Sequence, residues 1–130
     1  MQSQLPEFEA LDPADLLTVA RSLQGNADPA SKRSAGDRAY YAAFLISRVE
    51  LANRGLLIPT GRPDDHRLVM TVLRGSLGNN MGNRMEQLRR ARNMVTYDMR
   101  QLRVSDRDVR PLAWMIQTAE DLIKRVRALP

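Results

Sequence analysis

The chain of 130 residues has the usual size of one domain built around one core. It contains no run of about 18 apolar residues and no cysteine, which excludes a membrane-spanning helix, disulfides, thiolate metal sites and a cysteine nucleophile. Its first residues also lack the basic start and apolar stretch of a secretory signal, so we expect a cytoplasmic protein that does not bind a membrane.

Charge is unevenly distributed along the chain, whose formal net charge is +5. Residues 1–30 hold five acidic residues and one arginine, a net charge of −4, so the remainder carries +9. Residues 84–110 hold eight arginines against four acidic residues. The excess of arginine over lysine, 18 to 2, is explained equally well by a GC-rich genome. The clustering is the stronger evidence for an anionic partner.

Helix signals dominate, and no sustained alternation of β-branched residues predicts a strand. Asp12-Pro13 is typical of a helix start and predicts a short helix to about Leu23, ended by Gly25-Asn26. Residues 1–28 therefore form a short helix with an acidic lead-in.

A longer helix is predicted from Asp28-Pro29 to about Leu56. Residues 39–46 are apolar nearly all round, so this helix is either the centre of a bundle or shared with a second subunit. Its main stripe comprises Ala35, Ala39, Ala42, Ile46, Val49 and Leu56, while Tyr40, Tyr41, Phe44 and Leu45 cover the other faces.

Three further helices complete the pattern. One runs from about Asp64 to Arg74, and the glycine-rich stretch 75–82 predicts a turn after it. The next begins near Asn80. The last begins either after a capping box at Ser105-x-x-Asp108 or at Pro111. The inward stripe of the fourth helix is Met81, Met85, Leu88, Ala91 and Val95, and that of the fifth includes Leu112, Met115, Ile116, Ala119, Leu122, Ile123, Val126 and Leu129. We therefore expect an all-α, four- to five-helix antiparallel bundle, one domain over 1–130 with its core in 29–130.

Arg92 is the candidate for chemistry in the fourth helix. It lies about 40° from Leu88 and about 60° from Val95, at the edge of the apolar stripe. A charge there needs either an internal partner, Asp37 or Asp98, or a cleft that binds phosphate. Tyr97 lies about 140° further round, so it shares the site only if the helix ends or bends, or if two subunits build the site.

The segment Arg38–Phe44, RAYYAAF, is typical of a buried helix, and its alanines allow another helix to approach closely. Tyr40 or Tyr41 can lend a hydroxyl to a cleft, since a buried phenol usually finds a hydrogen-bond partner. His66, the only histidine, is expected to be a surface or capping residue. Too few ligands surround it for zinc, so neither a metal nor another cofactor is predicted.

These segments resemble the HEPN family (higher eukaryotes and prokaryotes nucleotide-binding) over residues 30–128. The similarity comprises RAYYAAF, a histidine opening the next helix, Leu88-x-x-Ala91-Arg92-x-x-x-x-Tyr97-Asp98 and a long amphipathic last helix. The resemblance implies a helical bundle that dimerises around a shared cleft. Many members are metal-independent endoribonucleases, and some are toxins paired with a nucleotidyltransferase antitoxin. The ribonucleases carry an arginine, a polar residue and then a histidine four to six residues after the arginine, whereas this chain has Tyr97 five residues after Arg92.

Two hypotheses follow. In the first, the protein is a metal-independent endoribonuclease or toxin acting as a homodimer, in which Arg92 and Asn93 bind the scissile phosphate and Tyr97 or Asp98 assists. In the second, it is a non-catalytic module that binds RNA or nucleotide or partners a nucleotidyltransferase, because tyrosine, with a pKa of about 10, is a poor base. The apolar 39–46 segment and an exposed-looking Trp114 favour the homodimer. Candidate RNA contacts in either case are Arg38, Tyr41, Arg84, Arg89 and Arg90.

Overall fold

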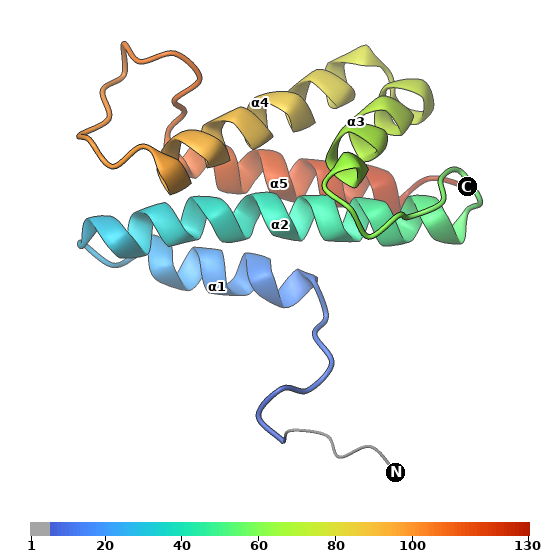
Figure 1. The fold of residues 1–130 in the computed structure, drawn as a ribbon, viewed down its shortest axis with the longest axis horizontal. Coiled ribbons are helices and arrows are strands. Elements are labelled where there is room, and N and C mark those ends of the chain that lie inside the picture. Colours follow the sequence, from blue (N-terminus) through green and yellow to red (C-terminus); the bar gives the residue numbers. More distant parts are fainter. Residues whose placement is uncertain (1–5) are drawn as a thin grey trace.

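The computed structural model describes residues 6–130, which form five helices and no strand (Figure 1). The predicted all-α bundle is thereby confirmed. No helix in this part of the chain is both long and apolar enough to cross a membrane. The helices are α1 (Ala14–Gln24), α2 (Pro29–Asn53), α3 (Asp64–Leu77), α4 (Asn79–Tyr97) and α5 (Leu112–Arg127).

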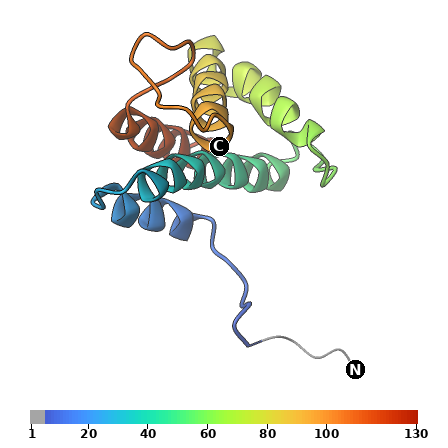
Figure 2. The ribbon, with the colours of Figure 1, turned by 60° about the vertical axis from the view of Figure 1, so that its left-hand side comes forward.

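Helix α2 is the central helix of the bundle. The other four helices all pack against it: α1 and α5 run along its length, and α3 and α4 form a hairpin that leans over it (Figures 1 and 2). Its apolar residues are therefore covered from several sides within one chain, and Tyr40 and Phe44 are only 1% and 3% exposed. Helices α2 and α5 run in the same direction, whereas α1 and α4 run opposite to α2.

The end of α2 comes earlier than the sequence predicts. The helix ends at Asn53 because Gly55 adopts a left-handed conformation with φ of 70°. The amides of Gly55 and Leu56 then donate to the carbonyls of Ala52 and Leu51, which closes the helix with a Schellman motif. Leu56 of the predicted inward stripe therefore lies beyond the helix and is exposed, and Val49 of the same stripe is exposed although it lies within α2.

The turn predicted over residues 75–82 is present but much shorter than predicted. Only Gly78, with φ of 100°, separates α3 from α4. Gly82 lies inside α4, where an added Cβ would lie 1.9 Å from Cγ of Arg74. This glycine therefore allows α3 and α4 to approach closely. In the sequence, a glycine with this packing role looks the same as a glycine that forms a turn.

The capping box predicted at Ser105 and Asp108 is wrong, since α5 begins at Leu112, directly after Pro111. The loop before it is closed by Asp106, which accepts from the amide of Arg103 and from Arg100. Trp114 is half-buried against the core rather than exposed, with the guanidinium of Arg110 5.5 Å from its ring.

Candidate functional site

Arg92 projects from α4 onto α2, where three side chains hold its guanidinium. Its Nε donates to Oδ1 of Asp37 at 2.8 Å, and its Nη2 donates to the hydroxyl of Tyr41 at 2.9 Å. Its Nη1 donates to Oδ1 of Asn93 at 2.9 Å. The side chain is 11% exposed, so the charge that sits at the edge of the apolar stripe is compensated by Asp37.

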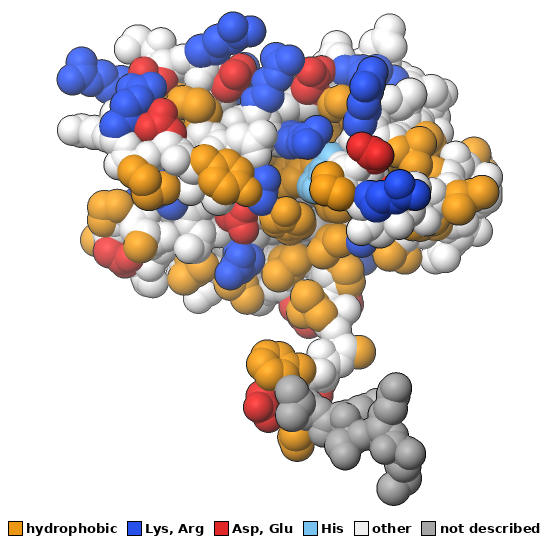
Figure 3. All heavy atoms as spheres, viewed as in Figure 1, with side chains coloured by type: hydrophobic (Ala, Val, Ile, Leu, Met, Phe, Trp, Pro, Cys, Tyr) orange, Lys and Arg blue, Asp and Glu red, His pale blue; other side chains and the backbone are white. Residues whose placement is uncertain are grey.

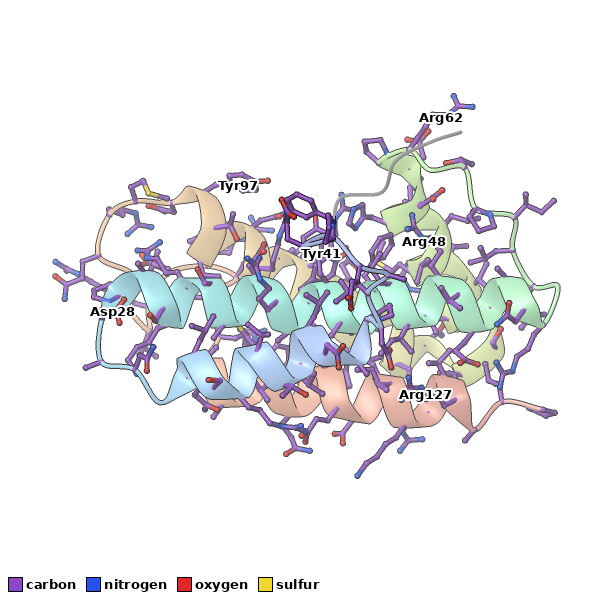
Figure 4. The ribbon with its side chains drawn as sticks, turned by 90° about the horizontal axis from the view of Figure 1, so that it is seen from below. Asp28, Tyr41, Arg48, Arg62, Tyr97 and Arg127 are labelled. Carbon is purple, nitrogen blue, oxygen red and sulfur yellow. The ribbon has the colours of Figure 1, made fainter. Side chains whose placement is uncertain are left out.

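Tyrosine rings surround the same guanidinium. Its central carbon lies 4.8 Å from the ring centre of Tyr41, 5.4 Å from that of Tyr97 and 5.7 Å from that of Tyr40. Helix α4 continues unbroken to Tyr97, so the expectation that a bend or a second subunit must bring Tyr97 to Arg92 is wrong. That expectation considered only the directions in which the two residues leave the helix axis. Both side chains are long enough to reach each other across the angle between these directions. Figure 4 shows Tyr97, Tyr41 and Arg48 in a row along the edge of α2 that faces α3 and α4.

His66 belongs to this site as a half-buried residue, so the expectation of a surface or capping residue is only partly right. Its ring stacks on Phe44 with centroids 4.0 Å apart, and its Nδ1 lies 2.5 Å from the hydroxyl of Tyr40. Burial, together with the charges of Arg89, Arg92 and Arg48, lowers the pKa of His66 to about 4. The imidazole is therefore neutral at pH 7.

Asp65, the neighbour of His66 in the chain, anchors the start of α3 to the preceding loop and to α2. Its buried carboxylate accepts from the amide and hydroxyl of Thr60 at 2.9 and 2.5 Å, from the amide of Gly61 at 3.0 Å and from Arg48 at 3.0 Å. The hydroxyl of Thr60, with the backbone amides and Arg48, lowers the pKa of Asp65 to about 2. Asp65 does not stand out in the sequence, because an acidic pair in a helical first turn is most often a surface feature that complements the helix dipole.

The other predicted site residues are dispersed. Asp98 is not a partner of Arg92, because its carboxylate binds Arg100 at 3.0 Å and its carbonyl accepts from Arg33. Of the predicted RNA contacts, Arg84 pairs with Asp121 of α5 at 3.2 Å, Arg90 with Glu86 at 2.9 Å and Arg38 with Asp37 at 3.0 Å. Arg89 is half-buried and acts electrostatically on His66 and Tyr40.

We call Asp37, Tyr41, Arg92, Asn93 and Tyr97 the Arg92 cluster. In Figure 3 the Lys and Arg side chains gather along the upper edge of the face that also exposes the pale-blue histidine. No three His, Cys, Asp or Glu side chains within residues 6–130 come together as a metal site. The arrangement therefore offers cationic and neutral hydrogen-bond donors beside aromatic rings, a combination suited to a phosphate group and a stacked base.

No protein-family model matches the chain, and no curated protein or solved structure shows a significant match to it.

Proposed function

We propose that this chain is a HEPN-type RNA-acting protein that binds single-stranded RNA at the Arg92 cluster and cleaves it without a metal ion. The observation that carries the proposal is the environment of Arg92, a planar cation among three tyrosine rings. Arginine has five N–H groups, and within the described residues only three of those on Arg92 have partners. The other two remain for a phosphate oxygen.

The proposed reaction is an internal transesterification of RNA. The 2′-oxygen forms a bond to phosphorus and the bond to the 5′-oxygen breaks, which leaves a 2′,3′-cyclic phosphate and a 5′-hydroxyl. Water takes the proton of the 2′-hydroxyl, and Arg92 stabilises the negative charge on the phosphorane. The hydroxyl of Tyr41 accepts from Arg92, so its own proton is available for the leaving 5′-oxygen, and the phenolate then regains a proton from the protonated water. Without an efficient base, we expect slow cleavage.

The test is incubation of the protein with RNA in EDTA. We expect the wild type to leave 2′,3′-cyclic phosphate ends and Arg92→Ala to cleave about 100-fold more slowly, since one donor to the transition state is lost. Arg125→Ala is the matched control, because it removes the same charge from an exposed position on α5 and should cleave as the wild type. Cleavage by folded Arg92→Ala at the wild-type rate would contradict the proposal.

A second candidate is a non-catalytic module that binds RNA or nucleotide, or partners a nucleotidyltransferase antitoxin. Two observations favour it: Asp37 already neutralises Arg92, and no histidine follows Arg92 at the spacing of the ribonuclease members. RNA binding without cleavage by either the wild type or Arg125→Ala would select this candidate.

Homodimerisation stays a prediction of the HEPN resemblance. The two sequence features that favoured it are accounted for within one chain, since α2 is covered by four helices and Trp114 packs against the core. Light scattering at micromolar concentration tests it, and a monomer would limit the site to residues of a single chain.

A further inference from the structure

Two contacts fix the orientation of the His66 ring. Its face stacks on Phe44 with the two planes 12° apart, and its Nδ1 edge points at the hydroxyl of Tyr40. Since Nδ1 and Nε2 lie on different edges of an imidazole, the Nε2 edge is directed away from Tyr40. A ring held by both its face and one edge is preorganised for a contact at the other edge.

The Tyr40 contact also determines which nitrogen carries the hydrogen. Tyr40 is 1% exposed, and burial raises the pKa of its hydroxyl, so the phenol keeps its proton. Its hydroxyl has no partner other than Nδ1 of His66 within the described residues. If Nδ1 donated to Tyr40, the buried phenol proton would have no acceptor, which is costly. Tyr40 therefore donates to Nδ1, and the hydrogen of the neutral ring lies on Nε2.

The Nε2–H group has no partner in the described part of the protein, yet it reaches solvent. The buried side-chain atoms left unpartnered there are the hydroxyls of Ser47 and Thr118, and Nε2 is not among them. His66 thus presents a neutral donor of fixed direction at the surface, beside the Arg92 cluster.

The charges around His66 favour an anion. Positive charge comes from Arg48 on α2 and from Arg89 and Arg92 on α4, and negative charge comes from Asp65 on α3. The carboxylate of Asp65 is already saturated by Thr60, Gly61 and Arg48. The neutral phenols of Tyr40 and Tyr41 face the ring from α2. An imidazolium would be repelled by three guanidinium groups, whereas a phosphate would be attracted by them.

We propose that His66 is a neutral positioning donor, whose Nε2–H binds a phosphate oxygen of RNA together with Arg89 and Arg92, and that it does not transfer protons. This inference rests on the proposed RNA function and assigns a second phosphate contact beside Arg92. It also predicts that RNA binding does not respond to histidine ionisation between about pH 5 and pH 8, the range in which an ordinary histidine titrates.

Nitrogen-15 NMR tests the proposal directly, because His66 is the only histidine of the chain. The shifts of the two ring nitrogens distinguish the tautomers. We expect hydrogen on Nε2, no titration between about pH 5 and pH 8, and a shift of the Nε2–H signal when inorganic phosphate or a 2′-O-methyl oligonucleotide is added. Hydrogen on Nδ1, titration near pH 6.5, or an Nε2–H signal unmoved by both ligands would overturn the proposal.

Variants separate donation from proton transfer. Affinity is measured on the 2′-O-methyl oligonucleotide, which cannot be cleaved. His66→Leu should raise its Kd about tenfold, because a hydrogen bond to a charged acceptor is lost. His66→Gln keeps an N–H donor and should stay within about threefold of the wild type in Kd. If His66→Gln keeps its affinity but loses cleavage as completely as His66→Leu, His66 transfers protons and the proposal fails. If neither the wild type nor the His66 variants cleave RNA, but NMR shows hydrogen on Nε2 and a shift of its signal with ligand, then the ribonuclease function fails and the phosphate contact stands.

Discussion

Arg54 and Arg92 occupy similar environments and are bound in opposite ways. Both are largely buried, with 20% and 11% of their side chains exposed. Arg54 uses every N–H group: Nε and Nη2 donate to the carbonyl of Leu129, Nη2 to that of Arg127, and Nη1 to the carbonyl and carboxylate of Glu50. Arg92 uses three, and all its partners are side chains.

The difference lies in what a ligand can displace. Most acceptors of Arg54 are carbonyls that end α5 or belong to α2, so they move only if the backbone moves. The partners of Arg92 can change rotamer, and the flanking ring of Tyr97 is 68% exposed. Burial of an arginine therefore does not identify a functional site. Unused donors and movable partners are better indicators, and of these two arginines Arg92 alone has both.

The largest expected effect is on stability, from Arg54→Ala. This change leaves the terminal carbonyls of α5 and the carboxylate of Glu50 without their donor, so we expect the free energy of unfolding to fall by about 3 kcal/mol. Urea unfolding measures it. Arg92→Ala should cost less, about 1 kcal/mol, because Asp37 still binds Arg38 and Thr96.

RNA affinity should show the reverse order in the same two variants. Arg54→Ala, measured where it is folded, should bind RNA as the wild type does, whereas Arg92→Ala should bind more weakly. The distinction between the two arginines would be contradicted if both variants lost the same free energy of unfolding, or if Arg54→Ala also lost affinity for RNA.

The elements of the fold are predictable from the sequence because their signals are local. Asp28-Pro29 starts a helix through the carboxylate that accepts from the amide of Ser31. Helical spacing then assigns the buried face of α5 correctly, including Met115 and Leu122. The turn predicted over residues 75–82, which the structure confines to Gly78, shows the limit, since a glycine looks the same in sequence whether it reverses the chain or admits a neighbouring side chain.

The site is only half predictable for a related reason. Arg92 is detectable because it lies at the edge of an apolar stripe. The sequence narrows its internal partner to two candidates, Asp37 and Asp98, but does not decide between them. The choice of Asp37 and the pairing of His66 with Tyr40 depend on how α2, α3 and α4 cross. No local spacing encodes those contacts.

Asp65 resembles Arg54 in that its charged group is fully hydrogen-bonded within the protein, and for a carboxylate this predicts a pH dependence of stability. The pKa of Asp65 lies at about 2 in the folded protein, below its ordinary value of 3.8. A lowered carboxyl pKa stabilises the fold fully above the ordinary value, and that stabilisation is lost as the pH falls from about 4 toward 2. Asp65→Asn should therefore unfold with a weaker pH dependence across this interval. Denaturation midpoints at pH 7, 4 and 2.5 measure the effect, and identical pH dependence in both proteins would refute it.

Tyr97→Ala should have the smallest effect on the fold and a selective effect on RNA. The ring is mostly exposed and ends α4, so we expect the free energy of unfolding to change by less than about 0.5 kcal/mol. Stacking of one base on an aromatic side chain contributes about 1–3 kcal/mol, so the Kd for a single-stranded oligonucleotide should rise at least about fivefold. Fluorescence anisotropy measures it, with Ile58→Ala as the control, because Ile58 is 84% exposed and belongs to the loop between α2 and α3. An unchanged Kd in Tyr97→Ala would show that this exposed ring is not the surface on which a base stacks, and would leave the site with its phosphate contacts and the half-buried ring of Tyr41.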